Sequence, residues 1–102
     1  MSIVSRGTTP THTFRTSIDL TGAAVLFITY MQAGKTILEK DLSDCTITSQ
    51  DVTVTLTQKE SLRFKENGLV RMQIRGKFPD GSAVKSCIME ATADELLKEG
   101  VI

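Results

Sequence analysis

Aromatic residues are scarce in this chain of 102 residues, which has no Trp, one Tyr and four Phe. A core therefore has to be built mainly from aliphatic side chains, and a stacking platform for bases or sugars is not indicated. Long hydrophobic runs are absent as well. The longest, residues 22–31, is interrupted by Thr29 and is too short to span a bilayer. The first residues lack the apolar stretch of a secretory signal, so we expect a protein that folds in a reducing cytoplasm.

Net charge is absent too, because 12 basic side chains balance 12 acidic ones. Electrostatics therefore offers no long-range attraction to polyanions, and we expect neither nucleic acid nor a membrane among the partners. The length suits one domain, and no Pro-, Ser- or Gly-rich linker divides the chain. We expect a single domain over residues 1–102, with residues 1–10 as a leading strand or N-terminal arm.

Cysteine and histidine are rare, with only Cys45, Cys87 and His12. Two interpretations of the cysteines stay open: a bridge between two sheets, or two free, mostly buried thiols. The missing export signal and the missing Trp that packs on such a bridge favour free thiols. A metal site needs several convergent ligands, and no C-x-x-C or H-x-x-x-H spacing is present. We therefore expect no metal and no cofactor.

Catalytic chemistry is not indicated either. His12 could pair with a cysteine or a hydroxyl group, but no strand-to-helix nucleophile elbow is present. Most acidic residues mark turns or exposed faces instead of forming a catalytic pair. These are Asp19, Glu39, Asp41, Asp44 and Asp51. We expect a protein that is not an enzyme and has no catalytic residues.

Short apolar alternations, each closed by turn residues, fill the chain. Residues 70–75 alternate strictly between apolar and polar side chains, and residues 52–57 repeat the pattern. A period of two places one set of side chains on each face of a strand, so each strand buries one side only. One-sided strands have to pair and then stack. The pattern predicts a mainly β fold, an immunoglobulin-like, Greek-key antiparallel β-sandwich of about seven or eight strands.

Turn residues divide the chain into predicted elements. The predicted strands cover residues 11–18, 23–31, 35–42, 45–48, 52–56, 69–78 and 82–91. Two capping boxes predict helix starts. Thr57 and Glu60 begin a short helix near 58–65, and Thr92 and Glu95 begin a short C-terminal helix.

One basic stripe lies on the strand 69–78. Arg71, Gln73, Arg75 and Lys77 share one face of this strand. The stripe could contact phosphates, or it could be a solvated or partner-facing surface whose charges discourage edge pairing. Zero net charge favours the second interpretation, and we take these four residues as the candidate partner-facing site.

Several segments carry a resemblance to a known kind of protein. They are residues 2–11, 54–62 and 70–75, the Asp80-Gly81 turn, and residues 95–102. Together they are similar to small prophage-encoded structural proteins of Firmicutes. Their layout resembles the N-terminal domain of phage baseplate upper proteins.

The resemblance implies a non-enzymatic β-sandwich component of a phage tail or baseplate. Such a protein would act through protein–protein contacts, associate with itself as a homo-oligomer and dock on other tail proteins. It would be made in the bacterial cytoplasm and carried in the tail or baseplate of the virion. The resemblance transfers no catalytic residue. One alternative stays open, a small binding module for a surface carbohydrate or a host protein.

Overall fold

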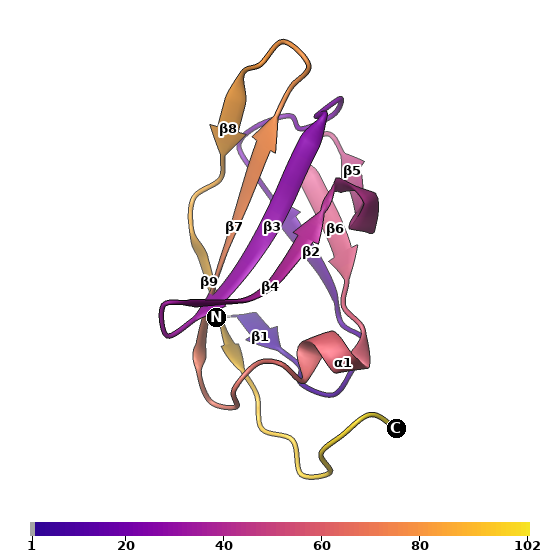
Figure 1. Cartoon of the computed structure of the whole chain (residues 1–102), viewed down its shortest axis with the longest axis vertical. Helices are drawn as coiled ribbons and strands as arrows, with labels where there is room; N and C mark the ends of the chain where they lie inside the picture. The colour runs from indigo at the N-terminus through magenta and orange to yellow at the C-terminus, as the bar shows by residue number, and fades with distance from the viewer. Residues whose placement is uncertain (1) are drawn as a thin grey trace.

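Two β-sheets packed face to face make up the computed structural model, which describes residues 2–102 (Figure 1). The strands are β1 Ser2–Val4, β2 Thr11–Arg15, β3 Val25–Gln32, β4 Lys35–Asp41, β5 Cys45–Thr48, β6 Asp51–Thr55, β7 Leu69–Lys77, β8 Ala83–Lys85 and β9 Met89–Ala93. A 3₁₀ turn, η1, covers Leu42–Asp44, and one α-helix, α1, covers Gln58–Ser61. The prediction of a mainly β chain is confirmed.

The strands connect in a Greek-key pattern. The larger sheet has the order β1-β9-β7-β3-β4, with β8 also paired to β7, and the smaller sheet has the order β2-β6-β5. Immunoglobulin sandwiches place their strands B, E and D in one sheet and G, F, C and C′ in the other. The strands β2-β6-β5 and β9-β7-β3-β4 follow that connectivity.

The larger sheet is mixed, so the expectation of a purely antiparallel sandwich is wrong. β1 runs parallel to β9, with Ile3 beside Thr92 and Val4 beside Ala93. Residues 5–10 then carry the chain across to β2 in the smaller sheet. β1 and β9 are distant in the sequence and are not joined by a tight hairpin, which would force antiparallel pairing. They can therefore pair in parallel.

The strand expected over residues 82–91 is divided into β8 and β9, which gives nine strands within residues 2–102 where we expected seven or eight. Ser86 lies at the division. Its amide donates to the carbonyl oxygen of Ile74 at 2.8 Å, and its hydroxyl accepts from the amide of Ile74 at 3.0 Å. A side chain thus replaces one backbone partner of β7, and regular pairing stops there.

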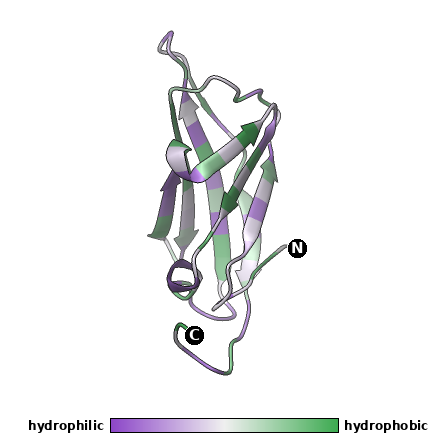
Figure 2. Cartoon of the chain, turned by 90° about the vertical axis from the view of Figure 1, so that its right-hand side faces the viewer, coloured by the Kyte–Doolittle hydropathy of each residue, from purple (hydrophilic) through white to green (hydrophobic). Residues whose placement is uncertain are grey.

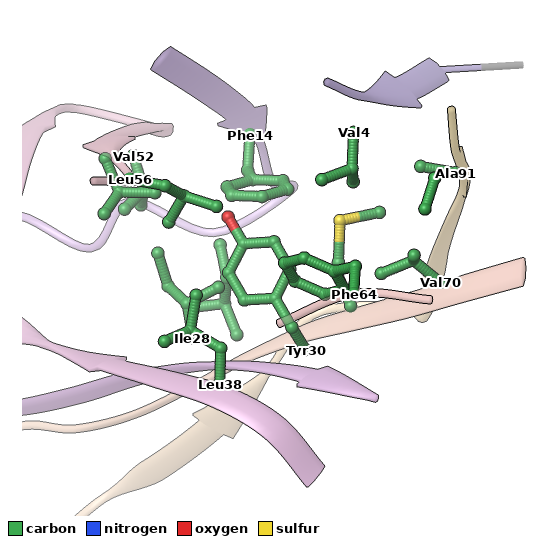
Figure 3. Close-up of a cluster of buried hydrophobic side chains, with 14 of the residues drawn as sticks. Val4, Phe14, Ile28, Tyr30, Leu38, Val52, Leu56, Phe64, Val70 and Ala91 are labelled. Carbon is green, nitrogen blue, oxygen red and sulfur yellow. The ribbon is translucent and has the colours of Figure 1, made fainter. Parts of the chain in front are cut away.

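The core lies between the sheets and follows the alternation of the sequence, which Figure 2 shows as green and purple bands along the strands. Leu26, Ile28 and Tyr30 of β3 all have no exposed surface. Tyr30 lies between two other rings, with centroids 6.3 Å from Phe14 and 5.6 Å from Phe64 (Figure 3). Edge-to-face contacts of this kind are favourable beyond the apolar area that they bury.

The first capping box is confirmed. The Thr57 hydroxyl accepts from the Glu60 amide at 3.1 Å, and the Glu60 carboxylate accepts from the Thr57 amide at 2.9 Å. The helix is a single turn, Gln58–Ser61, and ends before the expected residue 65. Its buried Ser61 donates to the carbonyl oxygen of Thr8 and closes one end of the sandwich.

The expected C-terminal helix does not form. Residues 94–102 are irregular, and their trace runs below the sandwich in Figure 1. The Asp94 amide continues the β1–β9 pairing by donating to the carbonyl oxygen of Val4 at 3.1 Å, and the Asp94 carboxylate accepts from the Arg6 amide at 2.8 Å. A residue of the expected first helical turn is therefore held by β1 and by the Arg6 backbone. A helix this short also needs packing, and Leu97 is 93% exposed.

Candidate functional site

The predicted site residues lie on the outer face of the larger sheet. Val70, Met72 and Ile74 of β7 point into the core. Alternation therefore places Arg71, Gln73, Arg75 and Lys77 on the opposite side, where all but the half-buried Gln73 are exposed. None of the ion pairs within residues 2–102 involves the three cations of this stripe.

An exposed apolar column lies beside this stripe, on β3. Val25 and Phe27 are 41% and 40% exposed and point outward, as Thr29 and Met31 do. Sequence reasoning missed this column because residues 23–31 are apolar almost throughout. A continuous apolar run gives no sign of which face is covered.

Acidic residues occupy the other side of the apolar column, on β4. Asp41 lies opposite Phe27, and Glu39 lies opposite Thr29, which donates to the Glu39 carboxylate at 3.3 Å. The hydrogen bond from the Ser43 side chain is the main cause that holds the pKa of Asp41 below its ordinary value. Asp41 is therefore charged at neutral pH.

The three strands thus form rows across the face. Phe27 lies between Arg75 of β7 and Asp41 of β4, and Thr29 lies between Gln73 and Glu39. The β8 pairing adds Lys85 beside Arg75. We call this surface the outer face, and define it by the outward residues of β3, β4, β7 and β8. A hollow of about 250 Å³ on it is lined by Thr29, Met31, Arg71, Met72, Gln73, Arg75 and Ile88.

A second feature is the free edge of β2, which pairs only with β6 in the described chain. The Leu56 amide donates to the carbonyl oxygen of Pro10, and the Thr16 amide donates to that of Gln50, both at 2.9 Å. Even-numbered residues therefore bond to β6, and the backbone groups of residues 11, 13 and 15 point outward. A cavity of about 330 Å³ lies between this edge and residues of β1, β7 and β9.

His12 lines that cavity and contacts the core. Its Nδ1 lies 2.7 Å from the Tyr30 hydroxyl oxygen. Burial raises the pKa of Tyr30 and lowers the pKa of His12, so the phenol stays protonated and the imidazole stays neutral at pH 7. The direction of this hydrogen bond depends on the tautomer of the ring, and the other ring nitrogen, Nε2, is buried without a partner in the described chain.

The cavity does not assemble the catalytic pair that we considered from the sequence. No cysteine lines it. Both cysteines are free, as expected, but Cys87 is exposed and the expectation of a buried thiol is wrong there. Cys45 is half-buried on β5, where burial and the nearby Asp44 and Asp41 raise the pKa of its thiol to about 11. A neutral thiol of this kind is a poor nucleophile.

Two further features bear on the classes of site. Within residues 2–102, no three His, Cys, Asp or Glu side chains gather where they could hold a metal ion. The α-helical part of the described chain is a single turn, so no helix there has the length to cross a membrane.

Comparison with known proteins gives a distant likeness among solved structures and none elsewhere. No family model matches this chain, and no curated protein matches it. Among solved structures, it is similar to the V domain of amphioxus IgVJ-C2, at 11% identity and a TM-score of 0.38. The alignment covers 93% of this chain and all of that one.

Proposed function

We propose that this protein is a non-enzymatic docking module that works through protein–protein contacts, with the outer face as its contact surface. The observation that carries this proposal is the exposure of Val25 and Phe27 on β3, a strand paired on both sides, with Phe27 between Arg75 of β7 and Asp41 of β4. Apolar area with a charged rim is typical of protein-interaction surfaces.

The setting that we propose is a phage or prophage tail or baseplate. The segments that resemble prophage structural proteins and the domain of baseplate upper proteins support it. The partners would then be other tail proteins and further copies of this chain, and the protein would move from the bacterial cytoplasm into the virion. The free edge of β2 offers a second place where an extended partner segment can add a strand.

A binding module for a surface carbohydrate has less support. Sugar sites usually present several exposed aromatic rings. Of the aromatic residues here, Tyr30, Phe14 and Phe64 are buried in the core, Phe78 packs against it, and Phe27 is the exposed ring of the outer face. A host protein would use the same face as a tail protein, and only the binding experiment distinguishes the two.

The test is a binding assay against tail proteins encoded beside this chain. Phe27→Ser and Arg75→Glu should each weaken binding about tenfold or more, because they remove the apolar centre and reverse one charge. Thr46→Glu, on the exposed side of β5 in the other sheet, is the matched control and should leave binding unchanged. Wild-type protein that binds no tail protein, or binding that tolerates the outer-face variants, would contradict the proposal.

A further inference from the structure

The outer face is electrostatically asymmetric about β3. Arg71, Arg75 and Lys77 lie on the β7 side, and Glu39 and Asp41 lie on the β4 side. Lys85 of β8 adds to the positive side. Glu90, which lies opposite Arg71 on β9, reduces the positive charge at one end only. The separation is therefore sharpest at the row that holds Arg75, Phe27 and Asp41.

Such a surface complements a second copy of itself in one orientation. If two outer faces meet about a two-fold axis parallel to β3, β7 of each copy lies over β4 of the other. Cations then face acids on both sides of a shared apolar centre. An axis perpendicular to the strands would instead place β7 on β7, with cations facing cations. A two-fold contact has to be self-complementary, and only the first orientation satisfies this condition.

We propose that two copies of this chain form a symmetric dimer through their outer faces, with the two-fold axis parallel to β3. The proposal rests on the proposed function, in that it makes this chain itself one of the partners of the contact surface. Rotation about this axis preserves height along β3, so residues of one row meet residues of the same row. Arg75 of each copy then faces Asp41 of the other, and Gln73 faces Glu39.

The size of the face sets the expected strength of the dimer. β3, β4, β7 and β8 have 8, 7, 9 and 3 residues, and a rise of about 3.3 Å per residue with a strand spacing of about 4.8 Å gives a surface of roughly 400–450 Å². Stable interfaces bury about 800 Å² on each partner. We therefore expect a reversible dimer with a dissociation constant in the micromolar range or above, which weakens as salt screens the charges.

The decisive experiment is a charge swap between chains. Arg75→Glu alone places acids against Asp41 at both symmetric contacts, and Asp41→Lys alone places cations against Arg75 at both. Each variant should dimerise at least about tenfold more weakly than the wild type in sedimentation equilibrium. Mixed together, the two variants should form a heterodimer of near wild-type strength, because both contacts again pair opposite charges.

Two further variants keep the test informative if Asp41→Lys disturbs the η1 cap. Asp41→Asn keeps an acceptor for the Ser43 amide and removes the charge, so it should weaken the dimer without loss of folding. Gln73→Lys should tighten the dimer, because it places a cation against Glu39. The proposal would be overturned if the single variants dimerise like the wild type. It would also be overturned if the mixture of Arg75→Glu and Asp41→Lys does not recover the strength of the wild-type dimer.

The two proposals fail in different ways. A wild-type chain that stays monomeric at about millimolar concentration, yet binds tail proteins through the outer face, would overturn the dimer and leave the docking function intact. A chain that dimerises as described but binds no tail protein would overturn the proposed setting and leave the dimer.

Discussion

His12 and Tyr30 form a hydrogen bond between a strand of the smaller sheet and the centre of the core. Figure 3 shows the Tyr30 ring among the buried apolar side chains, with its hydroxyl pointing away from β3. The tyrosine is fully buried, and its hydroxyl depends on His12 Nδ1 for a partner. Burial disfavours the charged form of the imidazole, so protonating His12 costs more in the folded state than in the unfolded chain.

Acid should destabilise the protein through His12. Burial lowers the pKa of His12 below its ordinary 6.5 in the folded state, so the unfolded chain binds the proton more readily. Its contribution to the free energy of unfolding is then complete above about pH 7 and falls as pH drops from there towards the folded pKa, by at most about 1.4 kcal/mol per pH unit.

Urea denaturation at about pH 7.5 and about pH 5.5 measures this effect. His12→Asn is the control, since an amide can accept from Tyr30 but does not titrate. Between the higher and the lower pH, the free energy of unfolding should fall more in the wild type than in His12→Asn. An equal fall in both proteins would contradict this prediction and assign the pH dependence to the carboxyl groups.

Gly68 is required for a close approach of the backbone to Gln32. The Gln32 side chain is buried and donates to the Lys65 carbonyl oxygen at 3.0 Å, while it accepts from the Lys65 amide at 2.8 Å. A Cβ at Gly68 would lie 2.6 Å from Gln32 Nε2. Gly68→Ala has to displace an amide that is held by two hydrogen bonds.

We expect Gly68→Ala to lower the free energy of unfolding by about 2 kcal/mol. Gly34→Ala, in a turn where nothing lies within 4 Å of the added Cβ, controls for the change of residue type, although its own φ of +76° adds some strain. Chemical denaturation of both variants gives the comparison. If Gly68→Ala is as stable as the wild type, the Gln32 contact is not required.

At the scale of elements, α1 is held to β4 by an ion pair that is largely removed from solvent. Lys40 Nζ lies 2.7 Å and 2.8 Å from the two Glu60 oxygens, and the side chains are 10% and 17% exposed. Burial alone would raise the pKa of Glu60. The hydrogen bonds from Lys40 and Thr57 and the charge of Lys40 outweigh it and lower the pKa. Glu60 thus joins the capping box to the sheet.

Glu60→Gln should destabilise the fold by about 2–3 kcal/mol, because it leaves the Lys40 ammonium buried without its counter-ion. Lys40→Met combined with Glu60→Gln should recover part of that loss, since no unpaired charge remains. A double-mutant cycle at neutral pH measures the coupling. A coupling near zero would contradict this account.

Local pattern predicted the elements whose partners are adjacent in the chain. The pairing of β3 with β4 and the Thr57 capping box are local, and turn residues and capping residues indicate them. The division at Ser86 and the loss of the C-terminal helix depend on contacts with Ile74 and Arg6, which are distant in the sequence. Such contacts leave no periodic signal.

The candidate site was predictable on one strand only. Alternation placed Arg71, Gln73, Arg75 and Lys77 on one face of β7 correctly. Their apolar and acidic neighbours on β3 and β4 come from strand order and register, which the sequence pattern does not specify. The surface is therefore a property of the sheet.

At the scale of the whole molecule, Arg6 joins three segments at one end of the sandwich. Its Nε donates to the Phe64 carbonyl oxygen at 2.7 Å, its guanidinium lies 3.1 Å from Glu99, and its backbone amide donates to Asp94. The side chain is only 9% exposed. The loop after β1, the segment before β7 and the C-terminal segment thus share one cation.

Arg6→Ala should lower the free energy of unfolding by about 2–3 kcal/mol, because it removes packing and leaves the Phe64 carbonyl group unsatisfied. Glu99→Ala removes only an exposed partner, and should cost less than about 1 kcal/mol. Thermal or urea unfolding of both variants measures the two losses in free energy of unfolding. Similar losses would place the stabilisation in the ion pair instead of the buried bond.

The parallel pairing of β1 with β9 has a consequence for synthesis on the ribosome. β1 can pair with β9 only when residues 91–93 have left the exit tunnel. Until then β1 has no pairing partner, and Val4 cannot be buried in a complete core. A nascent chain therefore completes this sandwich in a late step, after β9 has emerged from the ribosome.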